Sequence, residues 1–185
     1  MFNSRIIGLL FVVGFVTSQA PPSFDKSCME LKTTKRADDC CMIPGAFDVA
    51  LQKRCFDEIK LTKVASEDIK CLAECIAREL GAFKNRTLIK ENARKVFETT
   101  IGSDANFKPI LGDVFEKCYT KVAELIARND NKNATCHFAP DFLMNCVESG
   151  LFENCPAALW NKDAGCVELK EKLKNGCPFL TISDS

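Results

Sequence analysis

The residues of this 185-residue chain with the most chemical potential are its 12 cysteines. Cysteines form disulfides, bind zinc as thiolates or act as nucleophiles, and their spacing helps to separate these roles. Zinc sites usually contain C-x-x-C pairs, whereas this chain has C-x-x-x-C at Cys71 and Cys75 and no C-x-x-C. We therefore expect disulfides and no metal. The cysteines are Cys28, Cys40, Cys41, Cys55, Cys71, Cys75, Cys118, Cys136, Cys146, Cys155, Cys166 and Cys177.

Two pairs of neighbouring cysteines restrict the pairing. Cys71 and Cys75 are four residues apart, so on a helix they lie on one face, one turn apart. Each should therefore reach a different segment and tie one helix to two others. Cys40 and Cys41 are adjacent, and disulfide geometry disfavours a bond between them.

The N-terminus predicts an oxidising compartment, in which disulfides persist. Residues 1–20 resemble a secretory signal, with Arg5 as the positive charge and an apolar run over residues 6–16 that is too short to span a bilayer. Cleavage after Ser18 and cleavage after Ala20 are both open. The sequence thus predicts a secreted, extracellular domain over residues 21–185. Two sequons, at Asn85 and Asn133, are candidate glycosylation sites.

The secondary structure after the signal segment is predicted to be helical. Apolar residues recur every four positions at Phe47, Leu51, Cys55 and Ile59, and no period-two clusters of Val and Thr support strands. Helix-ending glycines and first-turn prolines occur at intervals along the chain. We expect an all-α domain with six amphipathic helices, over residues 45–59, 66–81, 88–101, 109–126, 140–148 and 164–174.

Composition excludes several functions. Lys plus Arg and Asp plus Glu both number 25, and nucleic-acid-binding domains normally carry a basic excess. The only histidine is His137, and the chain has neither a G-x-S-x-G motif nor the His-Asp dyad that secreted phospholipase A2 places beside its Cys-Cys pair. We therefore expect no enzyme, no cofactor and no nucleic-acid partner, and a structural or surface role for His137.

From Cys71 to Cys166 the spacing reads C-x3-C-x42-C-x17-C-x9-C-x8-C-P-x9-C. This order resembles that of the insect odorant-binding proteins. The additional Cys136, the proline after Cys155 and the late Cys166 resemble the Plus-C subgroup of that family. The resemblance implies about six helices around an apolar cavity.

Carried over by position, the resemblance implies the pairs Cys71–Cys146 and Cys118–Cys155. It also implies a bridge from Cys75 to an upstream cysteine. Cys41 fits the spacing of the family members that have six cysteines slightly better than Cys55 does. Both cysteines remain candidate partners of Cys75.

The resemblance further implies a carrier that binds small hydrophobic odorants or semiochemicals in its cavity and delivers them through sensillum lymph towards an olfactory receptor. A monomer and a homodimer are both compatible with the sequence. The alternative is a secreted interaction or lipid-binding protein of saliva or reproductive fluid. Apolar residues of the predicted helices are the candidate ligand contacts, namely Phe97, Ile101, Leu111, Phe115, Leu125, Phe142 and Phe152.

Overall fold

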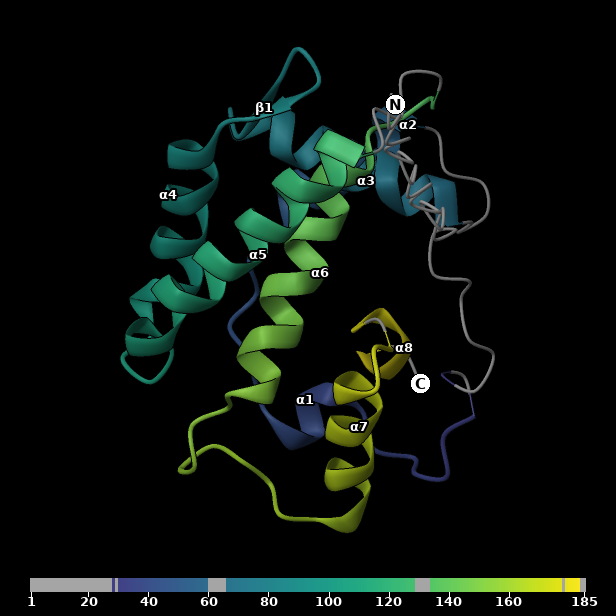
Figure 1. The fold of residues 1–185 in the computed structure, drawn as a ribbon, viewed down its shortest axis with the longest axis vertical. Helices are drawn as coiled ribbons and strands as arrows, with labels where there is room; N and C mark the ends of the chain where they lie inside the picture. The colour runs from purple at the N-terminus through teal and green to yellow at the C-terminus, as the bar shows by residue number, and fades with distance from the viewer. Residues whose placement is uncertain (1–27, 29, 60–65, 129–133, 178, 184–185) are drawn as a thin grey trace, which may run out of the picture.

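The computed structural model describes residue 28 and residues 30–59, 66–128, 134–177 and 179–183, and in these parts the chain is mainly helical (Figure 1). Six helices of at least eleven residues carry the fold: α2 (Val49–Ile59), α3 (Ser66–Glu79), α4 (Lys90–Thr100), α5 (Lys108–Arg128), α6 (Phe138–Glu153) and α7 (Ala164–Lys174). Two four-residue helices, α1 (Ala37–Cys40) and α8 (Leu180–Ser183), complete the set. The predicted all-α class is confirmed.

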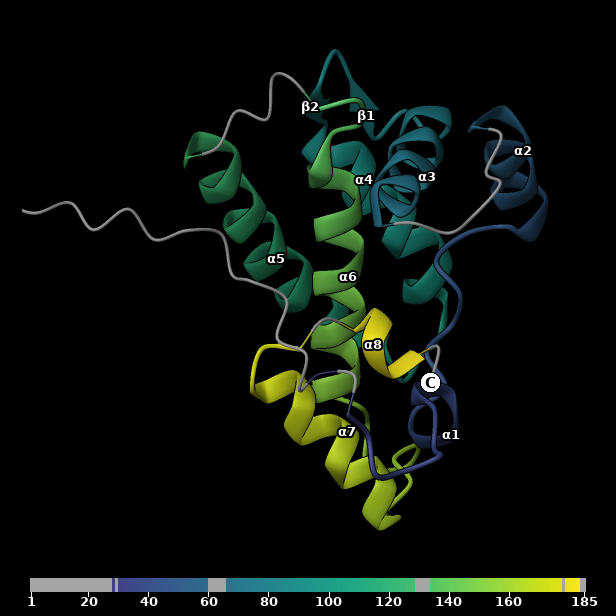
Figure 2. The ribbon, with the colours of Figure 1, turned by 90° about the vertical axis from the view of Figure 1, so that its right-hand side faces the viewer.

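Helix α6 is the centre of the molecule, and it runs through the middle of both ribbon views (Figures 1 and 2). It packs against α5, α3 and α7. Leu143, Val147 and Leu151 recur every four residues along it and are buried. The approach of α5 requires Gly150, because a Cβ atom there would lie 2.6 Å from Val114 Cγ1. The prediction ended this helix near Glu148, too early, because a helix buried on several sides lacks the polar stripe that marks an amphipathic one.

A short hairpin was not expected from the sequence. Strands β1 (Phe83–Lys84) and β2 (Thr87–Leu88) pair antiparallel between α3 and α4. Asn85 and Arg86 make the turn with φ values of 50° and 61°, as two-residue hairpin turns require. Strands of two residues are too short to produce an alternating pattern, so periodicity could not reveal them.

All twelve cysteines form disulfides, and each of the two neighbouring pairs bonds as expected to separate segments. Cys71 and Cys75 tie α3 to two different segments of the chain, and Cys40 and Cys41 bond different partners. The six bonds are Cys28–Cys177, Cys40–Cys166, Cys41–Cys155, Cys55–Cys75, Cys71–Cys136 and Cys118–Cys146.

The pairings Cys71–Cys146 and Cys118–Cys155, which the family resemblance implied, are wrong. Cys71 bonds Cys136, which directly precedes α6, with 5.1 Å between their Cα atoms. Cys146 lies more than two turns further along α6, about 12 Å from its first residue at 1.5 Å per residue, and faces α5 instead. The additional Cys136 therefore shifts each later partner by one cysteine.

The upstream partner of Cys75 is Cys55, the second of the two that the sequence left open. Cys41 is occupied by Cys155, which follows α6. The bond between Cys55 and Cys75 holds α2 on α3, and these two helices pack against each other.

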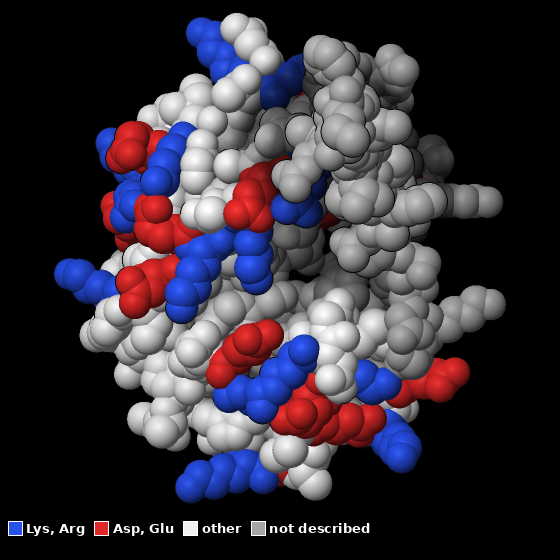
Figure 3. Space-filling model, viewed as in Figure 1, with Lys and Arg blue, Asp and Glu red and all other residues white. Residues whose placement is uncertain are grey.

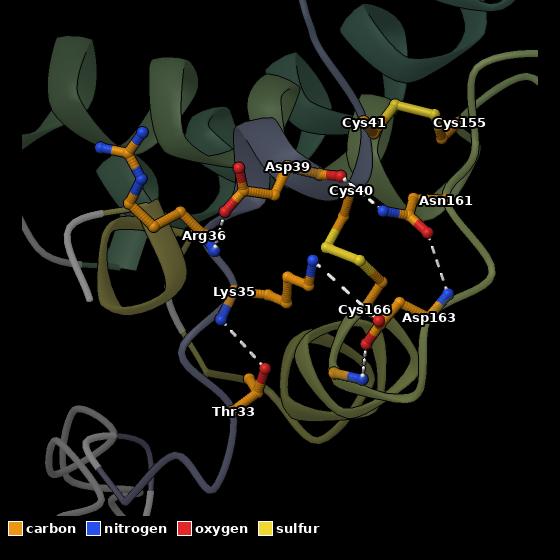
Figure 4. Close-up of a disulfide and its surroundings, with 11 residues drawn as sticks. Thr33, Lys35, Arg36, Asp39, Cys40, Cys41, Cys155, Asn161, Asp163 and Cys166 are labelled. Atoms are coloured by element: carbon orange, nitrogen blue, oxygen red, sulfur yellow. Dashed lines mark hydrogen bonds and ion pairs between the residues drawn. A yellow bond between two sulfur atoms is a disulfide. The ribbon is translucent and has the colours of Figure 1, made fainter.

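The N-terminal segment is fastened to α7 by bonds of several kinds (Figure 4). Cys40 bonds Cys166 of α7. Asn161 donates from its side chain to the backbone oxygen of Asp39, at 3.0 Å, and from its backbone to that of Cys40, at 2.9 Å. Asp163 accepts from the backbone N–H of Gly165 and so caps α7. These contacts join the start of the domain to its end, where α8 also packs on α1.

Charges of both signs are interspersed on the face shown in Figure 3. The mixture agrees with equal numbers of acidic and basic residues and gives this face no single-sign patch. Among the described residues, no helix combines the length and apolarity that crossing a membrane would need. The predicted signal segment lies outside the described residues.

Candidate functional site

Two adjoining hollows lie between α4 and the segments around it. The first, called here the inner cavity, is a partly open pocket of about 30 Å³, space for about two water molecules. The second is an open groove of about 480 Å³, within the range of small-molecule sites. Phe47, Leu80 and Val96 line both hollows, so these three side chains form the boundary between them.

The inner cavity exists because small side chains surround it. Alanines contribute from α3, from the hairpin approach and from α4, where larger residues would fill the space. All of the described lining side chains are apolar, so the cavity offers water few hydrogen-bond partners and favours an apolar occupant. They are Phe47, Ala73, Ala77, Leu80, Ala82, Leu88, Ala93, Val96, Phe97, Pro140, Leu143 and Met144.

The groove lies between α4 and the start of α2. Ala46, Phe47 and Leu51 form an apolar wall on the α2 side. Opposite them, one face of α4 supplies Asn92, Lys95, Val96, Thr99 and Thr100, spaced three or four residues apart as neighbours on a helix face are. Asp48 and Leu80 complete the described lining.

Helix α2 contributes Leu51 to the groove while sharing little of the main core. Leu51 and Cys55 pack with Cys75 and Ile76 in a small cluster that is separate from the main core. Phe47 packs against both clusters. The wall of the groove therefore rests on α3 through one disulfide and a few apolar contacts.

The seven predicted ligand contacts fall into different places. Phe97 lines the inner cavity and is buried. Ile101, Leu111, Phe115 and Phe152 are buried in the main core and are not among the described lining residues of either hollow. Phe142 is partly buried against that core, and Leu125 is partly exposed on α5. Whether any of them contacts a ligand stays a prediction.

The alanines that line the inner cavity were missed because the sequence reasoning favoured large apolar side chains. A large side chain usually fills space, whereas a cavity arises where side chains are small. Ala73 and Ala77, one turn apart on α3, with Ala93 on α4, were the available signal.

His137 has the structural role expected of it. Its Nδ1 accepts from the backbone N–H of Ala139 at 3.1 Å and caps α6, and its backbone N–H donates to Glu74. Its ring stacks with Phe138 and lies tilted against Phe83. Burial, together with the positive charge of Arg86, lowers the pKa of His137, although the carboxylate of Glu74 acts in the opposite direction. The lowered pKa favours the neutral ring, whose Nδ1 can accept a hydrogen bond.

Glu148 of α6 is a carboxyl group whose acidity is strongly changed by its surroundings. Burial raises its pKa from 4.5 to about 7, and the carboxylates of Asp141 and Asp38 act in the same direction. Between these two values the folded state binds more protons than the unfolded state does. The contribution of Glu148 to stability is therefore complete below pH 4.5 and is lost as the pH rises through about 7.

Glu148→Gln keeps this position neutral at every pH. We expect the variant to be more stable than the wild type at pH 8, by up to about 3 kcal/mol, and nearly equal to it at pH 4.5. Urea unfolding at both pH values measures the difference. Glu124→Gln, at an exposed position of α5, is the control and should change stability little at either pH. A gain from Glu148→Gln that is the same at both pH values would contradict the assignment.

Comparison with known proteins identifies the family. A family model described as AgamOBP47-like matches residues 48–172. The chain is 29% identical to General odorant-binding protein 67 of Anopheles gambiae over 188 residues, which cover 95% of this chain and 91% of that protein. It is 27% identical to Odorant-binding protein 47 of Anopheles gambiae over 163 residues, covering 79% and 71%. Because the family model spans well over half of the chain, the protein belongs to the AgamOBP47-like, Plus-C type of the insect odorant-binding proteins, a family of carriers and not of enzymes.

Proposed function

We propose that the protein binds a small hydrophobic molecule, an odorant or other semiochemical, in the groove and inner cavity and carries it through extracellular fluid towards an olfactory receptor. The observation that carries this proposal is a groove of about 480 Å³ that adjoins a cavity lined by apolar side chains. The names of the two relatives, both odorant-binding proteins, support the same class of ligand.

Affinity at such a site would come mainly from desolvation. Each methylene group that leaves water contributes about 0.8 kcal/mol, and the loss of translational and rotational freedom offsets part of the sum. A ligand with eight to ten carbons gains about 6–8 kcal/mol in this way, and its net affinity is smaller by that offset.

Binding of the fluorescent apolar probe N-phenyl-1-naphthylamine to the refolded, oxidised protein tests the proposal. We expect micromolar binding that small apolar organic compounds reverse. Val96→Trp should weaken the probe at least about tenfold, because the indole would occupy the boundary between cavity and groove.

Val167→Trp is the matched control for this variant. Val167 is a half-exposed valine of α7 outside the described lining of both hollows, so its replacement should leave probe affinity unchanged. Far-ultraviolet circular dichroism verifies that both variants are folded. If no apolar probe binds the oxidised wild type, the carrier function is wrong, and the alternative of an interaction or lipid-binding protein of saliva or reproductive fluid gains support.

The proposed site of action is extracellular, in line with six disulfides, which form and persist in oxidising compartments. Removal of residues 1–20 as a signal peptide belongs to this proposal. Asn85 is a reachable glycosylation site, since it is exposed in the turn of the β1–β2 hairpin. The second sequon, at Asn133, lies outside the described residues.

A further inference from the structure

The polar side of the groove is built by α4 and differs in chemistry from its apolar wall. Thr99 and Thr100 follow Lys95 and Val96 by one turn on the same face of α4. The two hydroxyl groups therefore lie about 5.4 Å along the helix from the boundary between groove and cavity. A ligand whose apolar part reaches this boundary would place a polar end within reach of them.

Both threonine hydroxyls already use their protons. Thr99 Oγ1 donates to the backbone oxygen of Lys95 at 2.7 Å, and Thr100 Oγ1 donates to that of Val96 at 2.9 Å. A hydroxyl has one proton and two lone pairs, so what each threonine still offers to a ligand is an acceptor.

The other polar groups of the groove also favour a ligand that donates a hydrogen bond. The ionised carboxylate of Asp48 is an acceptor only, and one of its oxygens already accepts from the backbone N–H of Ala50. Asn92 uses an amide proton on the backbone oxygen of Gly81, at 2.8 Å, and keeps both an acceptor and a donor. Among the described lining residues, Lys95 alone is purely a donor; it is exposed, and the same lining contains the opposite charge of Asp48.

From this arrangement we propose that the groove selects ligands that donate a hydrogen bond, specifically aliphatic alcohols, with Thr99 and Thr100 as the specificity-determining residues. The alkyl chain lies on the apolar wall and the boundary side chains, and the hydroxyl proton goes to a threonine Oγ1. This inference rests on the proposed carrier function and adds the class of ligand. An acid is disfavoured because the described lining of the groove contains one lysine and one aspartate, so it has no net positive charge to hold an anion.

The test compares decan-1-ol with its methyl ether, 1-methoxydecane, which cannot donate. Displacement of N-phenyl-1-naphthylamine gives the ratio of their affinities. In Thr99→Val/Thr100→Val we expect this ratio to fall about fivefold from its wild-type value, the effect of one typical hydrogen bond, with little change for the ether itself. Valine keeps the shape of threonine and removes the acceptor.

Thr120→Val is the matched control. Thr120 of α5 is exposed, donates to the backbone oxygen of Glu116 at 2.9 Å in the same manner, and lies outside the described lining of the groove. It should leave the ratio unchanged. The inference is overturned if the double variant keeps the wild-type ratio within twofold, or if Thr120→Val lowers it equally. It is also overturned if decanoate binds at least tenfold more tightly than decanol and Lys95→Met abolishes that advantage.

Failure of the inference differs from failure of the carrier function. In the first case the probe binds and is displaced, but alcohol and ether respond alike to the threonine substitutions. In the second case the wild-type protein binds neither the probe nor any of these compounds.

Discussion

Replacing Cys40, Cys41, Cys155 and Cys166 by alanine should lower the free energy of unfolding by about 6 kcal/mol, since each disulfide typically contributes about 2–4 kcal/mol. The two bonds removed join the N-terminal segment to α7 and to the chain that follows α6. A loss of this size is comparable to the whole stability of many domains, about 5–15 kcal/mol. Guanidinium unfolding under oxidising conditions, followed by circular dichroism, measures it.

Two partial variants separate the contributions. Cys41→Ala/Cys155→Ala alone should cost only about 3 kcal/mol, because the adjacent Cys40–Cys166 bond still closes nearly the same loop. Cys55→Ala/Cys75→Ala should cost a similar amount, since that bond spans a sequence separation of 20. If the four-residue variant is no less stable than either two-residue variant, the structural role assigned to the Cys40–Cys41 pair is wrong.

Phe152→Ala should cost about 3–5 kcal/mol, the range for removing a large aromatic side chain from a packed core. Phe152 is completely buried and packs edge-on against Trp160 and Phe179, with ring centroids 5.4 Å and 5.9 Å away. Urea unfolding measures the change, and Trp160, the only tryptophan of the chain, reports it locally by fluorescence.

The control for this variant is Phe56→Ala on α2, where the side chain is 39% exposed and the cost should be about 1 kcal/mol or less. Phe152 also lies outside the described lining of both hollows. Folded Phe152→Ala protein should therefore bind N-phenyl-1-naphthylamine as the wild type does. A strong loss of probe binding with unchanged stability would instead support the sequence-based prediction that Phe152 contacts the ligand.

The helices were predictable where one face of each meets water. The repeat of Leu51, Cys55 and Ile59 marks α2, and Gly81, with φ of +67°, follows the end of α3 as a C-cap glycine should. The extent of α6 was less predictable, because neighbours cover it on several sides and remove the contrast on which periodicity depends.

Disulfide partners and lining residues were predictable only in part. The sequence shows that Cys71 and Cys75 must diverge, since both lie on one face of one helix. It does not show that Cys136 lies within 5.1 Å of Cys71 while Cys146 faces α5, because that depends on how far each helix slides along its neighbour. For the same reason the choice among apolar residues for the ligand site could not be made from hydrophobicity.

By itself the sequence determined that this chain is an all-helical, cysteine-bonded domain of the odorant-binding family type, because composition, helix punctuation and cysteine order are local or one-dimensional properties. Only the tertiary structure decided which cysteines meet, and that the hollows lie between α4, the start of α2 and the alanines of α3. Space inside a protein is what the surrounding side chains fail to fill, and so it depends on the packing of segments that are distant in sequence.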